Sequence, residues 1–393
     1  MELAKRMESL GTETAFSVLA KAKALEAEGR DIIHLEIGEP DFDTPSHIVE
    51  AGCRALCAGE THYTPTAGIP ELRAAIAADV AQSRGIAVEP EQVVVTPGGK
   101  PIMFFAILAL VEEGDEVLVP NPSFPIYESM VNFVGGRPVF VPLRQENEFR
   151  FDLDEFRAGL SGRTRMVILN SPANPTGGVL TPEDIAGLAE ILRERSDVFV
   201  LSDEIYSRLL YSGSFASIAS EPGMGPDGRT IILDGFSKTY AMTGWRLGYG
   251  VMPVPLAEQI TKLQVNSNSC TSAATQHAGL EALAGPQDSV DRMLSEFRAR
   301  RDLIVTGLDD LPGVECISPQ GAFYAFPRVT GTGHHAAALA DLLLEEAGVA
   351  CLSGTAFGRY GEGHLRFSYA NSRDNIGRAI ERMGEVLSRA AAR

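Results

Sequence analysis

Seven short apolar runs, rich in β-branched residues, alternate with helical segments through the middle of this chain of 393 residues. The runs are EQVVVTPG, DEVLVPNP, RPVFVPL, RTRMVILNSP, DVFVLSDE, RTIILDGFS and WRLGYGVM, and amphipathic stretches such as PEDIAGLAEILRERS separate several of them. Strands that are apolar throughout and are separated by helices indicate a mostly parallel sheet covered by helices on both faces. We therefore predict an α/β fold, with the functional side chains at the carboxyl ends of strands.

The two ends of the chain differ from this central pattern. The first 45 residues contain an amphipathic helix and an extended GEPDFDTP segment, and a long charged helix, SVDRMLSEFRARRDLIVTGLDDL, begins near residue 290. Two strand-like segments, GVECISPQGAFYAF and HLRFSYA, and a closing helix follow it. We predict a large domain over residues 46–290 and a smaller α/β domain built from an N-terminal arm, 1–45, together with 291–393.

The composition is that of an ordinary globular protein, with 45% hydrophobic and 22% charged residues. A formal net charge of −18 disfavours nucleic acid and anionic membranes as partners, because both attract basic surfaces. The N-terminal MELAKRMESLGTETAF lacks the apolar core of a signal peptide, and the longest apolar run, MFFAILALV, is far shorter than a bilayer span. We expect a cytoplasmic protein.

The cysteines do not form a disulfide pattern. There are five of them, an odd number widely scattered, which favours a reducing compartment. Cys53 and Cys57 would share a helix face, which is compatible with a metal-binding pair or with a buried face. Because the chain has neither a CxxC nor an HExxH pattern, we expect no metal site and interpret both cysteines as core residues.

Several chemically distinctive side chains follow the predicted strands. TPGGK, residues 96–100, opens an apolar helix, where backbone N–H groups and the helix dipole favour an anion, although such a Gly-Gly turn is more often structural. Phe124, in NPSFPIY, is either a core aromatic or a platform for a planar ring. Asn174, in SPANPTG, lies between residues that stiffen the backbone, which would hold its amide in one place.

Two further stretches carry charge where burial is expected. Asp203, in VLSDEIY, ends a buried strand, where a carboxylate needs a partner such as a protonated ring nitrogen, and Tyr206 could reach the same ring. In DGFSKTYAMTGWRLGYG, Lys238 either extends to the surface along its aliphatic stem or is a desolvated, reactive amine, and the fork of Arg246 suits a phosphate. Together these groups are the ones needed to hold pyridoxal phosphate, which forms an imine with lysine and takes up carbanion electrons.

The sequence resembles the class I/II pyridoxal-phosphate aminotransferases of fold type I, and most closely their aspartate aminotransferase branch. The resemblance runs through IGEPDFDTP, HYTPTAGIPELRAAI, TPGGK, SPANPTGG, SDEIY, SKTYAMTGWRLGY, GAFYAF and LRFSYA, which is nearly the whole chain. It implies pyridoxal 5'-phosphate as cofactor and a homodimer with shared active sites. It also implies ping-pong transfer of an amino group between an L-amino acid and a 2-oxo acid, with aspartate- or glutamate-type substrates.

The resemblance gives each matching residue a role around the cofactor ring. Lys238 is similar to the Schiff-base lysine that also carries the proton, and Asp203 to the acid paired with the pyridine nitrogen. Tyr206 and Asn174 match the donors to the ring hydroxyl oxygen, and Phe124 matches the stacking residue.

Other matching residues would bind phosphate and substrate. The family's phosphate-binding positions are matched by the backbones of Gly98, Gly99 and Lys100 and by the side chain of Arg246. Tyr63 matches a tyrosine that reaches the phosphate of the neighbouring subunit. Arg366 matches the arginine that binds the substrate α-carboxylate, helped by Gly38 and Asn174.

Two positions depart from the family's pattern. Gly235 stands where many relatives have a phosphate-binding serine, so the phosphate would rely more on the GGK turn and Arg246. No arginine occurs between Arg246 and Arg292, a region from which some aspartate aminotransferases supply an arginine for the distal carboxylate. Lys100 and Ser17 resemble the pair that another subgroup uses.

Two other functions fit parts of this pattern. β-Elimination from a cysteine-type substrate shares the scaffold and the first steps, and would release pyruvate and ammonia without an oxo acid. A transcription regulator with an aminotransferase-like sensor domain would need an N-terminal DNA-binding domain with basic elements. The chain instead begins with the arm of the enzyme domain and is strongly acidic, which disfavours that function.

Overall fold

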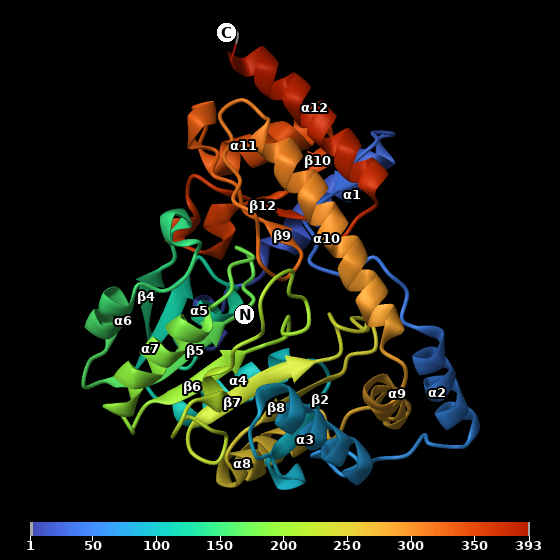
Figure 1. Ribbon diagram of the computed structural model, residues 1–393, viewed down its shortest axis with the longest axis vertical. Helices are drawn as coiled ribbons and strands as arrows, with labels where there is room; N and C mark the ends of the chain where they lie inside the picture. The colour runs from blue at the N-terminus through green and yellow to red at the C-terminus, as the bar shows by residue number, and fades with distance from the viewer. Residues whose placement is uncertain (1–2, 392–393) are drawn as a thin grey trace.

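A sheet of seven strands lies at the centre of the larger part of the molecule (Figure 1), in a computed structural model that describes residues 3–391. Its strands are β2 (Val93–Thr96), β3 (Glu116–Asn121), β4 (Arg137–Pro142), β5 (Thr164–Asn170), β6 (Phe199–Asp203), β7 (Thr230–Gly235) and β8 (Gly248–Val251). Each lies within one of the apolar runs quoted above. Across the sheet their order is β2-β8-β7-β6-β5-β3-β4. Because only β8 runs antiparallel to its neighbours, the predicted α/β fold with a mostly parallel sheet is confirmed.

Helices cover both faces of this sheet. One face packs against α4 (Lys100–Leu110), α5 (Ile126–Phe133) and α8 (Val254–Val265). The other packs against α2 (Ser46–Cys57), α3 (Pro70–Arg84), α6 (Leu153–Gly159), α7 (Pro182–Arg193) and α9 (Ala273–Ala284). Successive strand residues point to opposite faces, so the strands must be apolar throughout: Val94 packs in the first core, and Val93 and Val95 in the second. None of the described helices combines the length and apolar character needed to cross a bilayer.

Segments from the N-terminal and C-terminal portions of the chain build the smaller part of the molecule, at the top of Figure 1. There β1 (Ile33–His34) pairs in parallel with β10 (Val349–Ala350), and β11 (Leu352–Ser353), β12 (Leu365–Ser368) and β9 (Tyr324–Ala325) form an antiparallel sheet. The helices are α1 (Thr14–Ala27), α10 (Asp288–Asp309), α11 (Ala336–Leu342) and α12 (Arg373–Ala391). The boundary near residue 290 stays a prediction, because α10 contributes Val290 to the core of the larger part and Phe297 to that of the smaller.

The interpretation of Cys53 and Cys57 as core residues is wrong, because both are exposed. The buried residues of α2 are Ile48, Ala51, Gly52 and Ala55, which recur at helical spacing. Cys53 and Cys57 occupy other positions along the helix than these buried residues, on the side that faces away from the core. Spacing along a helix predicted that they share a face, but it could not predict which face is buried.

Candidate active site

A cavity of about 460 Å³ opens at the carboxyl ends of β5, β6 and β7. Asn170 and Asp203, the last residues of β5 and β6, line it from the sheet. The predicted site residues that line it are Gly38, Gly99, Lys100, Phe124, Asn174, Asp203, Tyr206, Lys238, Arg246 and Arg366. Gly98 is not a lining residue but packs against Arg246, which is. Tyr63 is 87% exposed and does not line the cavity of its own chain.

Lys238 is partly buried where the segment after β7 borders the cavity. Its Nζ donates a hydrogen bond of 2.6 Å to the carbonyl oxygen of Gly38, which belongs to the N-terminal segment. Burial lowers the pKa of the amine to about 8, against the opposing influence of Glu39. The amine is therefore desolvated and directed into the cavity, which excludes the alternative of a lysine extending to the surface.

Asp203 is a buried carboxylate held by neutral groups. Its Oδ2 accepts a hydrogen bond of 2.6 Å from the hydroxyl of Tyr127, and its Oδ1 accepts the backbone N–H of Ile205 at 3.3 Å. Burial raises the pKa of Asp203 to about 6, although both hydrogen bonds oppose the rise. Burial makes the ionised form of Asp203 energetically costly, and a cationic N–H donor in the cavity would stabilise it.

Arg366, on β12, is 3% exposed and reaches the cavity from the smaller part of the molecule. Its Nη1 donates to Oδ1 of Asn174 at 3.0 Å, and its Nη2 donates to the carbonyl oxygen of Glu36. Its guanidinium also lies over the rings of Tyr324 and Phe357, 4.6 and 4.8 Å from their centroids. Within residues 3–391 the Nε of this arginine has no hydrogen-bond partner, an uncommon condition for a buried donor that leaves it free for an anion.

The TPGGK turn and Arg246 lie against each other. Gly98 has φ +90° and packs so closely on the guanidinium of Arg246 that an added Cβ would overlap it. Arg246 itself is held by the carbonyl oxygens of Thr243 and Pro97, at 2.8 and 3.4 Å. The N–H of Gly98 donates to the carbonyl oxygen of Thr96 at 2.8 Å. The turn opens α4, however, so the backbone N–H groups of Gly99 and Lys100 and the guanidinium form a suitable cradle for a phosphate.

The departure at Gly235 has a steric explanation. Gly235 pairs with Gly248 across β7 and β8, and an added Cβ would lie 2.9 Å from the Cα of Gly248. A serine therefore does not fit at this position unless the strands move apart. Ser237, two residues later, lines the cavity and supplies the hydroxyl of this segment.

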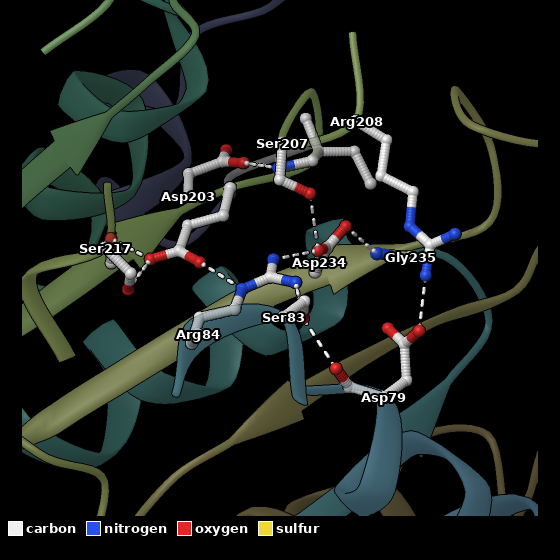
Figure 2. A network of polar contacts seen from close by, with 12 residues as sticks. Asp79, Ser83, Arg84, Asp203, Ser207, Arg208, Ser217, Asp234 and Gly235 are labelled. Carbon is white, nitrogen blue, oxygen red and sulfur yellow. Dashed lines mark hydrogen bonds and ion pairs between the residues drawn. The ribbon is translucent and has the colours of Figure 1, made fainter. Parts of the chain in front are cut away.

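A buried ion network next to Asp203 joins the ends of β6 and β7 (Figure 2). Arg84, the last residue of α3, donates through Nε to Glu204 at 3.0 Å and through Nη2 to Asp234 at 2.5 Å. Asp234 also accepts the backbone N–H of Gly235, and Ser207 donates to the same carboxylate. The network therefore fixes the two strand ends that carry Asp203 and lead to Lys238.

Two lining residues, Tyr127 and Tyr324, were not predicted as site residues from the sequence. Tyr127, three residues after Phe124 on α5, is the hydrogen-bond partner of Asp203. Tyr324, within the GAFYAF segment, exchanges a hydrogen bond of 2.7 Å with the hydroxyl of Tyr206 and covers the guanidinium of Arg366. Their positions in recognisable motifs were visible, but their partners lie far away in sequence.

These residues fit pyridoxal phosphate at three separate points. The uncompensated carboxylate of Asp203 suits a protonated ring nitrogen, the desolvated amine of Lys238 suits an aldehyde, and the Gly98–Arg246 cradle suits a phosphate. The orphan Nε of Arg366 is left for the carboxylate of a second molecule.

Known proteins similar to this chain agree with that chemistry. Residues 30–383 match the family described as Aminotransferase class I and II. The aspartate aminotransferase of Geobacillus stearothermophilus is 38% identical over 98% of this chain and 99% of that protein, and the aromatic-amino-acid aminotransferase 2 of Thermococcus litoralis is 39% identical over 98% of both. A structure of Thermus thermophilus aspartate aminotransferase with maleate has a TM-score of 0.93 at 38% identity, covering 98% of this chain and 100% of that one. The chain therefore belongs to the class I and II aminotransferases, the pyridoxal-phosphate-dependent transaminases of fold type I.

Proposed function

We propose that this transaminase moves an amino group between an aspartate- or glutamate-type L-amino acid and a 2-oxo acid, in two half-reactions at one site. The observation that carries the proposal is a single cavity lined by a desolvated amine, a buried carboxylate held by neutral groups, and a buried arginine with an unpaired N–H, namely Lys238, Asp203 and Arg366. Those three groups can hold a cofactor and a substrate carboxylate at the same time.

Pyridoxal phosphate, when bound, supplies a ring that accepts the electron pair released at the substrate α-carbon. We assign Asp203 to the ring nitrogen, where its negative charge keeps the nitrogen protonated. Tyr206 and Asn174 are assigned to the ring hydroxyl oxygen. Arg366 engages the amide oxygen of Asn174, so the amide nitrogen is the part left to donate. Phe124 is assigned to the face of the ring.

Lys238 is assigned both to attachment of the cofactor and to proton transfer at the α-carbon. Because burial lowers its pKa to about 8, more of it is the neutral amine at physiological pH than of an exposed lysine. The neutral amine is the form that attacks an aldehyde and accepts a proton.

Arg366 is assigned to the substrate α-carboxylate, beside Gly38. Its guanidinium is fixed by Asn174 and by the carbonyl oxygen of Glu36, so a carboxylate bound to the remaining N–H groups would have one orientation. That orientation would align the α-hydrogen for removal by the amine.

The substrate class rests on the relatives and on one cation. The Geobacillus and Thermus relatives are named aspartate aminotransferases, and the Thermus enzyme was solved with maleate, a dicarboxylate. Lys100, the first residue of α4, lines the cavity and is our candidate for the distal carboxylate. Ser17, its expected companion, is not among the lining residues, and its hydroxyl donates to the carbonyl oxygen of Thr14 at 2.7 Å.

A homodimer is also part of the proposal. Tyr63 is exposed, and so are Val49 and Leu56 on the outer side of α2. Val49 and Leu56 are two helical turns apart and so lie on the same side of α2, and exposed apolar side chains on one helix face are typical of an association site. We propose that Tyr63 completes the phosphate cradle of the second subunit, together with Gly98, Gly99, Lys100 and Arg246 of that subunit. A cytoplasmic location is supported by the free cysteines and the acidic composition.

A panel of L-amino acids assayed against 2-oxoglutarate, oxaloacetate and pyruvate tests the proposal. We expect the highest kcat/KM for aspartate and glutamate, with the amino acid derived from each oxo acid as product. Release of pyruvate and ammonia from a cysteine-type substrate without any oxo acid would instead establish β-elimination. Turnover confined to apolar or basic amino acids would contradict the proposed substrate class.

A further inference from the structure

The start of α1 borders the cavity, and the residue at its N-cap, Glu13, brings a negative charge. Glu13, Ala15 and Phe16 are lining residues. The carboxylate of Glu13 is hydrogen-bonded and ion-paired to the ammonium of Lys100. The same ammonium lies over the ring of Phe124, 5.3 Å from its centroid.

Glu13 also lies close to the arginine on the other side of the substrate space. A small cavity beside the main one is lined by Glu13, Phe124 and Arg366 together. Burial lowers the pKa of Arg366, and nearby groups, Glu13 among them, oppose that shift. The carboxylate therefore lies where the side chain of a bound substrate would extend from the arginine towards the lysine.

The position of Glu13 affects Lys100, the cation that we assign to the distal carboxylate of the substrate. In the described structure the ammonium of Lys100 already has a carboxylate partner from its own chain. A dicarboxylic substrate can pair with Lys100 only by displacing Glu13 or by sharing the cation with a second negative charge. A substrate with an apolar side chain meets no such competition, and Met103, Phe16 and Phe124 offer it an apolar lining.

We propose that Glu13 is a specificity-determining residue whose carboxylate competes with the distal carboxylate of a substrate for Lys100. The inference rests on the proposed function, because it takes Arg366 and Lys100 as the two ends of the substrate site. Glu13 thereby lowers the preference for dicarboxylates over substrates with apolar side chains.

The size of the effect follows from exposure. The side chain of Lys100 is 51% exposed and that of Glu13 is 20% exposed, so water screens their attraction and the pair can open. We therefore expect removal of the competing charge to tighten dicarboxylate binding by about threefold to tenfold, and not to abolish any activity.

The experiment measures binding of unreactive substrate mimics to the cofactor-loaded enzyme by calorimetry. Succinate represents dicarboxylates, and 3-phenylpropionate represents substrates with an apolar side chain. Glu13→Gln should raise succinate affinity by about threefold to tenfold relative to its effect on 3-phenylpropionate. Glu28→Gln is the matched control, because it removes the same charge from an exposed position after α1 and should change neither affinity.

A second variant tests whether the gain acts through the lysine. Combining Glu13→Gln with Lys100→Met should remove the gain in succinate affinity, because the cation that succinate would bind is gone. The inference is overturned if Glu13→Gln changes neither affinity or both by the same factor, or if the double variant keeps the gain. A wild-type enzyme that binds neither mimic and does not transaminate aspartate would mean that the proposed substrate site itself is wrong, an outcome distinct from unchanged affinities in an enzyme that turns aspartate over.

Discussion

Two groups of buried charged side chains lie within a few residues of each other at the ends of β6 and β7. They differ in the kind of partner that each charge has. In the network of Figure 2, Arg84 pairs with Glu204 and Asp234, and serine hydroxyls donate further hydrogen bonds to the same two carboxylates. In the cavity, Asp203 meets a phenol and a backbone N–H, and Lys238 meets a carbonyl oxygen. Charges paired with opposite charges hold the backbone, whereas charges held by neutral groups are left for a ligand.

The two groups of charges separate between two adjacent residues at the end of β6. Asp203 ends β6 and Glu204 follows it directly, so their side chains point in opposite directions. One carboxylate enters the cavity and the other enters the ion network. Substitutions on the two sides of this division should therefore have different consequences, for catalysis and ligand binding on one side and for stability on the other.

Lys238→Ala should have the largest effect. It removes both the group that attaches the cofactor and the group that moves the proton, so kcat should fall by at least about 10⁴-fold. The visible absorbance of the lysine-bound cofactor should disappear, while phosphate contacts still retain some cofactor. Lys23→Ala, at an exposed position of α1, is the control and should leave both unchanged. Full activity in Lys238→Ala would refute the assignment of the site.

Arg84→Met tests the paired side of the division. It leaves the carboxylates of Glu204 and Asp234 buried without their cation, which should lower the free energy of unfolding by about 3–5 kcal/mol. Urea denaturation of the cofactor-free protein measures this loss. Adding Glu204→Gln and Asp234→Asn should restore part of it, since the uncompensated charges are then removed. A loss below about 1 kcal/mol would mean that the network does not hold the strand ends.

Arg366→Lys should damage substrate binding and spare the fold. Lysine keeps the charge but loses the planar fork, and kcat/KM should fall by about 10²-fold, mostly through KM. The cofactor spectrum should stay as in the wild type, because Arg366 belongs to the substrate end of the cavity. An equal loss of cofactor affinity would place this arginine on the cofactor instead.

The strands and the residues at their carboxyl ends could be predicted because both are local in the sequence. Apolar runs fix the strands, and the polar residue that ends a buried strand must face a cavity or a partner. Partners that come from distant segments could not be predicted. Arg84 meets Glu204 and Asp234 across 120 and 150 residues, and no periodicity relates them. Glu13 reaches Lys100 in the same way, over 87 residues.

Tyr127→Phe should give the smallest effect, and it tests how a neutral partner keeps Asp203 ready for a ligand charge. Burial raises the pKa of Asp203 to about 6, and the hydrogen bond from Tyr127 lowers it, so removal of the hydroxyl should raise the pKa further. The anionic carboxylate that a protonated ring nitrogen needs is present above this pKa and is lost as the pH falls through it. Cofactor affinity should therefore begin to fall at a higher pH in Tyr127→Phe than in the wild type.

Titration of the cofactor-free protein with pyridoxal phosphate from pH 8 to pH 5 measures this shift, and we expect binding about tenfold weaker at pH 6 but nearly unchanged at pH 8. An equal loss at both pH values would mean that Tyr127 acts only through packing, and that the charge of Asp203 does not depend on its neutral partner.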